Sequence, residues 1–394
     1  VVKIAGSGFN EATHELATKF VRVISFSVIS VAIVQLGTGY LNVNDSFIIP
    51  NLLPIPSNII IIATIIVSHN TNNVSILPLG ALAGFILQGV VMLYYMRKLG
   101  FRYTVVIDLK DQHLINMIQI AMPLLLTSLV ITFDDLVMRS YATVIHGEGG
   151  YSYINNSFRL MGFATGLFIN GILSVAYPTI TQAASKDDKP RVITLMNDAI
   201  LLIALFVIPA TVGLASLSQE VVTFVYGGGR VTPDELSVLG KVFLGNVLGL
   251  FFMGLRDLFI RIHYSYQDMK TPLRAQVYYV IVDIVLFVVL GYFIGIQGLT
   301  LAGSLSALFV SIYLFNTLLN KFKRLGMGAI LGDFSKIILS SILMGLVIVV
   351  LKQILPERSA FFTLIITVLA GGGVYLASVW FMKVELVRSI LKRK

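Results

Sequence analysis

Eight charged side chains lie well inside long apolar stretches of this 394-residue sequence, away from the ends of these stretches. An ionisable group that faces lipid at the bilayer centre costs about 2.5–3.5 kcal/mol on insertion scales. Such groups therefore face a helix-bundle interior or a watery cavity, where they pair with one another or bind ions and charged substrates. The eight are Asp134, Asp135, Arg139, Arg159, Asp198, Arg256, Asp257 and Asp283.

One of these side chains belongs to a polar stripe on a predicted helix. Asn155, Arg159, Gly162, Gly166 and Asn170 recur at steps of three and four residues, which places them on one helical face. The stripe could be a small-residue packing face, with the arginine tethered in an ion pair, or a cavity wall that presents a fixed cation. We favour the cavity, because packing does not explain two asparagines and a guanidinium. A planar guanidinium also binds phosphate bidentately and stays charged when desolvated.

Two carboxylates are candidates for coupling an ion to a transport cycle. Asp135 and Arg139 stand four residues apart, so they could simply neutralise each other within one helix. Asp283, in "YYVIVDIVLFVV", has no local cation. A lone carboxylate at this depth indicates a sodium or proton site, or an interhelical partner, for which Asp135 and Arg139 are both candidates.

The sequence predicts no other cofactor. It has no cysteine, and its five histidines are scattered singly, without the spacing of metal ligands. The stretch "YGGGRVTPDE" is rich in glycine but lacks the Gly-Lys-Ser/Thr of a phosphate-binding loop. We interpret it as an extracytoplasmic turn that leads into a helix at Thr232–Pro233.

The composition places all these residues in a membrane protein. Hydrophobic residues make up 56% of the chain and charged residues 12%, against about 25% charged in soluble domains. Mean hydropathy is +0.87. About eleven apolar runs are long enough to cross a bilayer as helices, which predicts an all-α polytopic membrane protein. They lie near residues 20–36, 49–67, 76–96, 114–145, 151–183, 192–217, 239–262, 275–294, 299–319, 337–355 and 361–382.

Lysine and arginine gather in alternate loops. The basic loops are "RKLGFRYTVVIDLK", "SKDDKPR", "RIHYSYQDMKTPLR" and "NKFKRLGMG", and the tail "RSILKRK" falls on the same side. The positive-inside rule therefore places these loops and the C-terminus in the cytoplasm. Anionic membrane lipids on that side explain the net charge of +9 better than a nucleic acid does, so no nucleic-acid partner is expected.

Three sequence blocks occur in a characteristic order. They are "NNSFRLMGFATGLFINGILSVAYPTITQAAS", which contains Arg159-Leu160, then "FVYGGGRVTPDEL" and then "FIRIHYSYQDMKTPLRAQ". The third contains a Tyr-x-x-Gln-Asp-x-Lys-Thr-Pro motif over residues 264–272. In this order and spacing the blocks resemble those of the MurJ (MviN) lipid II flippases, in the multidrug/oligosaccharidyl-lipid/polysaccharide exporter superfamily. Spacing and hydropathy stay compatible with that family from about residue 20 to the C-terminus.

The resemblance implies a two-lobe exporter fold of fourteen helices, of which this chain would supply the fourth onward. Residues 1–98 would be the remaining helices of the N-terminal lobe, and residues 112–322 a C-terminal lobe of six helices. Residues 333–394 would be two additional helices and a basic cytoplasmic tail. We expect a monomer in the bacterial cell membrane.

The resemblance also implies that Arg159 contacts a lipid-linked pyrophosphate in a central cavity, and Arg261 matches a family arginine near the cytoplasmic end of its helix. The family's other substrate-binding arginines, on its first two helices, have no counterpart here. Some members hold sodium between three helices. Asp283 falls at the position of an asparagine that binds the sodium ion in those members. Phe287 and Gly303 stand where the other sodium ligands of that site would be. Met138 stands where the site has its carboxylate residue. The predicted substrate-binding residues are Arg159, Asn155, Asn170, Arg139 and Arg261, and the predicted ion-coupling residues are Asp283 and Asp135.

The leading hypothesis is a flippase that moves lipid II, the lipid-linked peptidoglycan precursor, from the cytoplasmic to the outer leaflet by alternating access. One alternative keeps the fold but changes the cargo to a teichoic or capsular oligosaccharide lipid, or to a cationic drug. Arg159 and Arg139 favour an anion over a drug cation. Another alternative is a membrane-embedded glycosyltransferase, which needs clustered carboxylates on a loop. The only loop pair, Asp187-Asp188, lies in a short lysine-flanked turn.

Overall fold

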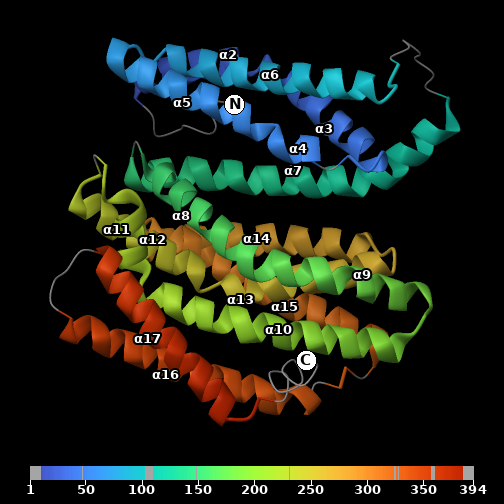
Figure 1. Ribbon diagram of the computed structural model, residues 1–394, viewed down its shortest axis with the longest axis vertical. Helices are drawn as coiled ribbons and strands as arrows, with labels where there is room; N and C mark the ends of the chain where they lie inside the picture. Colours follow the sequence, from blue (N-terminus) through green and yellow to red (C-terminus); the bar gives the residue numbers. More distant parts are fainter. Residues whose placement is uncertain are drawn as a thin grey trace. The chain divides into compact units, whose positions relative to one another are not determined.

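Helices are the only long regular elements in the part of the chain that the computed structural model describes (Figure 1). The described residues are 10–46, 48–102, 110–147, 149–229, 231–323, 325–326, 328–355 and 360–384, so the end of the predicted basic tail lies outside them. The chain divides into two compact units, Val1–Ile115 and Asn116–Lys394. Each unit is described by itself.

Unit 1 is built around one long helix, α6, against which α2, α3 and α5 pack. Leu41, Leu53, Met92 and Met96 form its buried core. The span predicted over residues 20–36 is broken in the structure, because α2 and α3 meet at an angle of 45°. The helices of this unit are α2 (Glu11–Ile24), α3 (Ser27–Val43), α4 (Ile48–Leu52), α5 (Pro54–Thr71) and α6 (Ile76–Lys98).

Unit 2 holds the remaining helices, apart from the first residues of α7, which belong to unit 1. They are α7 (Gln112–His146), α8 (Gly150–Ala164), the π-helix η1 (Thr165–Asn170), α9 (Gly171–Ser185), α10 (Lys189–Ser216), α11 (Ser218–Tyr226), α12 (Pro233–Val247), α13 (Leu250–Ser265), α14 (Lys270–Ile294), α15 (Gln297–Phe322), α16 (Gly328–Ile354) and α17 (Ala360–Phe381). Among the described residues of both units, ten helices are long and apolar enough to cross a membrane, or eleven with the bent α2–α3 pair. The predicted number of spans is confirmed.

The helix start predicted after the glycine-rich turn is also confirmed. Thr232 caps α12, its side chain accepts a hydrogen bond from the Glu235 N–H, and the Glu235 carboxylate accepts one from the Thr232 N–H. This reciprocal pair is a capping box, and Pro233 occupies the first turn.

Hydroxyl groups of α15 join it to α12 and, through Ser311 and the Phe252 carbonyl, to α13. The Thr300 hydroxyl donates to the Val242 carbonyl (2.8 Å), and the Ser304 hydroxyl donates to the Gly245 carbonyl (2.6 Å). Inside a membrane, small residues and interhelical hydrogen bonds hold helices together because lipid is as apolar as their side chains. Gly249, between α12 and α13, allows the closest approach, since a Cβ there would lie 2.7 Å from the Ser304 Cα.

Replacing Gly249 with alanine is therefore expected to destabilise unit 2 by about 1–3 kcal/mol, the usual cost of overpacking. The measurement is the thermal unfolding midpoint of the detergent-solubilised protein. Gly332→Ala is the matched control, because a Cβ at Gly332 meets nothing within 4 Å. Equal midpoints for the two variants would contradict the tight α13–α15 contact.

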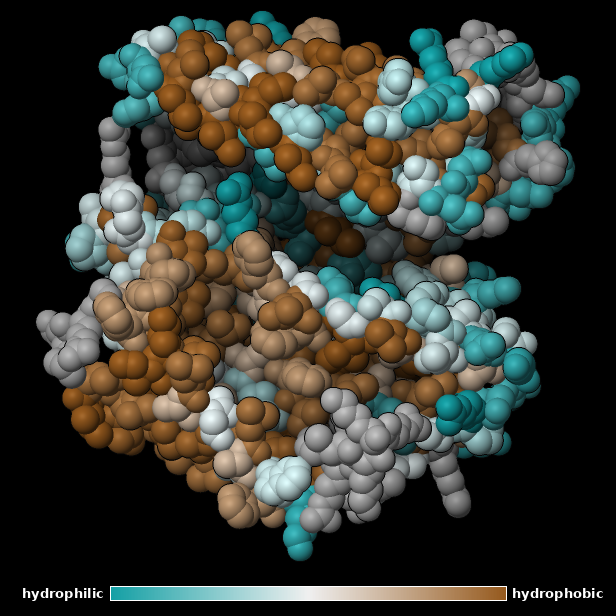
Figure 2. Space-filling model, in the orientation of Figure 1, coloured by the Kyte–Doolittle hydropathy of each residue, from teal (hydrophilic) through white to brown (hydrophobic). Residues whose placement is uncertain are grey.

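Helices α16 and α17 pack onto the rest of unit 2, and Figure 1 shows α10 beside α16. The Tyr375 hydroxyl donates to the Leu205 carbonyl (2.6 Å), and the Lys352 ammonium lies 2.7 Å from the Glu220 carboxylate. Apolar side chains cover much of α16 and α17 on the face shown in Figure 2. Large apolar residues of these helices such as Leu346 and Leu369 are exposed, as expected for helices that face lipid.

Candidate functional site

The continuous span α8–η1–α9 has one face buried in unit 2. Ile154, Met161, Ala164 and Ile169 belong to the hydrophobic clusters of this unit. Ser157 is also buried, and its hydroxyl accepts a hydrogen bond from the Asn246 amide of α12 at 3.2 Å. These contacts fix the rotation of the span about its axis and determine which face points away from the core of the unit.

The predicted polar stripe lies on that outward face. Arg159, Gly162, Gly166 and Asn170 are exposed and Asn155 is half-buried. A Cβ added at either glycine would meet nothing within 4 Å, so within unit 2 no described residue packs closely against these glycines.

Arg159 has no ion-pair or hydrogen-bond partner among the residues that the structure describes. The alternative that it is a tethered ion-pair partner therefore finds no support in the described part of the chain. A free guanidinium at membrane depth needs water or an anion, because lipid would exclude it.

The π-helix lies within the stripe. In a π-helix the hydrogen bonds reach five residues back instead of four, so each turn takes more residues. Gly166 and Asn170, four residues apart in η1, therefore stay close to the same side of the span. Such π segments are frequent at functional sites, and the sequence pattern gave no indication of this one.

Arg139 is paired within its own helix. Its guanidinium lies 2.8 Å from the Asp135 carboxylate and 4.5 Å from the centre of the Tyr151 ring. The Tyr151 hydroxyl donates to the same carboxylate at 2.9 Å. The self-neutralised pair that the sequence allowed is therefore present. We expect this pairing to leave Arg139 only a minor part in substrate binding, whereas ion coupling by Asp135 stays a prediction.

Replacing Arg139 with glutamine is expected to have a small effect. Partly exposed pairs at this spacing contribute about 0.3–0.5 kcal/mol, so the thermal midpoint should barely move. Lipid II flipping in proteoliposomes should fall by no more than about two-fold, the rate equivalent of that energy. A loss as large as that of Arg159→Ala would instead place Arg139 among the substrate-binding residues.

Arg261 lies apart from these groups, on α13, with its guanidinium 5.7 Å from the centre of the Tyr177 ring of α9. The motif that follows it is held by buried His263, whose Nδ1 lies 3.0 Å from the Asp268 carboxylate and whose Nε2 lies 3.0 Å from the Thr317 hydroxyl. Partial burial raises the pKa of Asp268, but hydrogen bonds from Thr271 and His263 outweigh it and hold the pKa of this carboxyl below its usual value. Asp268 therefore accepts, as a carboxylate, a hydrogen bond from the Thr271 N–H in the first turn of α14 at 3.0 Å.

Asp283 is fully buried, and its neighbour is Asp134 rather than the expected Asp135 or Arg139. Helix α7 packs against α14, with the Tyr141 ring beside the Phe287 ring and the Tyr141 hydroxyl donating to the Val288 carbonyl, and the buried side chains of Asp134 and Asp283 lie toward the same end of this contact. The Ser306 hydroxyl donates to Asp283 Oδ1 at 3.2 Å. The sequence showed Asp134 as an ionisable residue at membrane depth, but adjacent residues differ by about 100° around a helix. Only the packing of α7 shows which of the two acids turns toward α14.

A polar cavity of about 430 Å³ leads to Asp134. Gln276 and Tyr279 of α14 line it together with Arg256 of α13. The Arg256 guanidinium donates to the Asp257 carboxylate at 2.9 and 3.0 Å and lies 5.5 Å from the centre of the Tyr279 ring. These hydrogen bonds go to its own neighbour, and among the described residues it forms no ion pair with Asp134 or Asp283.

Apolar cavities surround α10. One of about 410 Å³ lies between α10, α11, α16 and α17, and one of about 760 Å³ lies between α10 and the η1–α9 segment. Phe168 and Phe206 line both, so the two join into one surface, which we call the apolar groove. Its first part contains Gly213, Tyr375 and Gly372, and its second Leu167, Val175 and Asp198.

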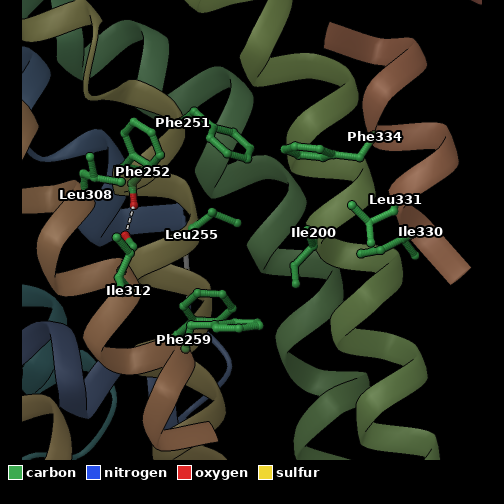
Figure 3. A pocket seen from close by; sticks show the side chains of 12 residues that line it. Ile200, Phe251, Phe252, Leu255, Phe259, Leu308, Ile312, Ile330, Leu331 and Phe334 are labelled. Atoms are coloured by element: carbon green, nitrogen blue, oxygen red, sulfur yellow. Dashed lines mark hydrogen bonds between the residues drawn. The ribbon is translucent and has the colours of Figure 1, made fainter. Parts of the chain in front are cut away.

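A smaller apolar pocket of about 240 Å³ lies between α10, α13, α15 and α16 (Figure 3). Phe251, Phe259 and Phe334 point into it. The one hydroxyl in its lining, that of Ser311, donates to the Phe252 carbonyl at 2.8 Å. This pocket therefore has no charged group with which to recognise a polar ligand.

Comparison with known proteins matches residues 1–370 to the family model described as lipid II flippase MurJ. The probable lipid II flippase MurJ of Thermotoga maritima is 25% identical over 396 residues, which cover 100% of this chain and 77% of that protein. The lipid II flippase MurJ of Thermosipho africanus is 25% identical over 391 residues, which cover 99% of this chain and 77% of that protein.

Comparison with solved structures also finds similarity to a lipid II flippase MurJ. A lipid II flippase MurJ in an inward closed conformation superposes with a TM-score of 0.83 at 26% identity, over 98% of this chain and 78% of that one. A multidrug resistance MATE family transporter of the MOP superfamily, in an inward-facing conformation, shares the fold at 15% identity with a TM-score of 0.69, over 82% and 75% of the two chains. Flippases are transporters, not enzymes, which removes the glycosyltransferase alternative. The chain belongs to the lipid II flippase MurJ family.

Proposed function

We propose that this protein moves lipid II from the cytoplasmic to the outer leaflet of the bacterial cell membrane by alternating access. The observation that carries the proposal is the exposed stripe on α8–η1–α9, whose Arg159 has no partner among the residues that the structure describes. A guanidinium at membrane depth binds the pyrophosphate of a lipid-linked sugar bidentately, and the low dielectric strengthens this contact. Asn155 and Asn170, on the same face, offer amide donors to the sugar and phosphate oxygens.

The apolar groove is suited to the prenyl tail of the same substrate. It is lined almost entirely by hydrocarbon side chains. Phe168 of η1 lies between Gly166 and Asn170 of the stripe in sequence and also lines the groove. The prenyl tail of a lipid whose head group contacts the stripe could therefore bind in the apolar groove along α10. The single substrate would meet a cationic surface and an apolar surface that begin on the same π-helix.

The proposal includes an orientation in the membrane, an oligomeric state and a division into lobes. The basic loops and the C-terminus lie in the cytoplasm, and the protein acts as a monomer. Residues 1–98 are helices of an N-terminal lobe, residues 112–322 form the C-terminal lobe, and residues 333–394 contribute the last two helices and the basic tail. Arg261, at the end of α13 with its basic loop, contacts the substrate head on the cytoplasmic side. Opposite movement of the two lobes would alternate access to the stripe.

The proposal is tested by complementation in a bacterium whose own lipid II flippase is depleted. The full-length protein should restore growth and prevent accumulation of lipid II in the inner leaflet. A protein that inserts at normal levels without restoring growth would contradict it. Restoration of teichoic acid or capsule export instead would assign the other class of lipid-linked cargo.

A further inference from the structure

Asp134 and Asp283 are two buried carboxyl groups, which we call the acid pair. The described residues offer them too few hydrogen-bond donors to stabilise two negative charges. Asp283 is 0% exposed and Asp134 8% exposed. The Ser306 hydroxyl satisfies Asp283 Oδ1. Asp283 Oδ2 and Asp134 Oδ1 are buried without a hydrogen-bond donor among the described residues. One oxygen on each acid is therefore left with no partner, which is costly for a buried polar group.

The charged groups around the pair do not neutralise it. On α7, Asp135 adds another negative charge and Arg139 is paired with it. On α13, the Arg256 guanidinium donates to Asp257. On α14, Tyr279 directs its hydroxyl to the Gly303 carbonyl of α15 at 3.5 Å. No ammonium or guanidinium in the described part of the chain bonds either acid.

Two ionised carboxylates cannot share this space. At a separation of 4 Å and an effective dielectric constant of 20, two like charges repel by about 4 kcal/mol. Neighbouring acids in such a site titrate as a pair, and one of them keeps a proton. A protonated carboxyl donates to the other, which supplies a donor where the structure lacks one.

We propose that Asp134 and Asp283 share a single exchangeable proton that couples the transport cycle to the proton gradient, an inference that rests on the proposed flippase function. The polar cavity at Asp134 gives water a route to the pair. Proton binding removes the repulsion between α7 and α14, and proton release to water on the other side restores it. The contacts between α7 and α14 would tighten when the proton binds and loosen when it leaves. One of them is the hydrogen bond from Tyr141 Oη to the Val288 carbonyl at 3.1 Å.

The pair can be observed directly by infrared spectroscopy of the purified full-length protein in lipid nanodiscs, with no substrate present. The wild type should show the C=O band of a protonated carboxyl at neutral pH, unchanged when potassium chloride is replaced by sodium chloride. Asp283→Asn and Asp134→Asn should each abolish this band. Asp333→Asn is the matched control and should retain it, because Asp333 is also 8% exposed but lies 3.1 Å from the Lys336 ammonium.

Flipping of labelled lipid II in proteoliposomes under an imposed pH gradient is the second measurement. The gradient should accelerate the wild type and Asp333→Asn and leave both variants of the pair unaffected. A missing band in the wild type, its persistence in both variants, or its displacement by sodium would overturn the proton site even if the protein flips lipid II. Absence of flipping with the band present would overturn the proposed function and leave the proton site standing.

Discussion

Replacing Arg159 with alanine is expected to reduce lipid II flipping about ten- to a hundred-fold. Hydrogen bonds to charged groups contribute about 1.5–3 kcal/mol, and each 1.4 kcal/mol corresponds to a factor of ten. Arg159→Lys should recover only part of the loss, because an ammonium keeps the charge but not the bidentate geometry. The measurement is the rate at which fluorescent lipid II moves between leaflets of proteoliposomes.

Arg191→Ala is the matched control for this experiment. Arg191 is an exposed arginine in the first turn of α10, outside the polar stripe, and its removal should leave the flipping rate unchanged. Insertion and thermal stability should be normal in both variants, because neither side chain is buried in unit 2. Equal flipping rates for Arg159→Ala and the wild type would remove Arg159 from the substrate site.

Filling the apolar groove is expected to have the next largest effect. Gly372 lines the groove on α17, and a Cβ there would meet nothing within 4 Å. A phenylalanine at this position should therefore fold normally while its ring occupies space that the prenyl tail requires. Misfit of this kind in an apolar site changes rates about ten-fold or more. Flipping of native lipid II should fall accordingly, whereas an analogue with a short prenyl chain should be slowed less.

The next residue provides the control for groove filling. Gly373 also has open space around it, but it is exposed on another side of α17 and does not line the groove. Gly373→Phe should flip native lipid II at the wild-type rate. If the two phenylalanine variants behave alike with both substrates, the prenyl tail does not use this groove.

The membrane spans could be predicted from the sequence because their cause is local. A helix crosses a bilayer when an apolar run is long enough to satisfy its own backbone in lipid. The breaks inside spans were not predictable in the same way. The 45° bend between α2 and α3 and the π-helix at Thr165–Asn170 occur in runs that remain apolar throughout. Their positions depend on packing against neighbouring helices.

In the candidate site too, features within one helix could be predicted from the sequence, whereas contacts between helices could not. The stripe with Arg159 follows from helical periodicity, because all its members lie on one span. The partner of Asp283 depends on how α7 packs against α14, and this packing brings in Asp134 rather than Asp135. Sequence spacing also showed that Arg139 and Asp135 could meet. Only the structure shows that they do so, and that the Tyr151 ring lies against the same guanidinium.

Cysteine accessibility tests most directly the claim that the stripe lines a watery, anion-binding cavity. The chain contains no cysteine of its own, so one introduced thiol reports one position. Gly162→Cys places it in the stripe, and Phe163→Cys places it at the neighbouring position, whose side chain is 82% exposed on another face. The Gly162→Cys thiol is expected to react with a membrane-impermeant maleimide, more slowly when lipid II is bound, while the Phe163→Cys thiol stays protected by lipid. Equal reactivity at both positions, or a Gly162→Cys thiol indifferent to lipid II, would contradict the account.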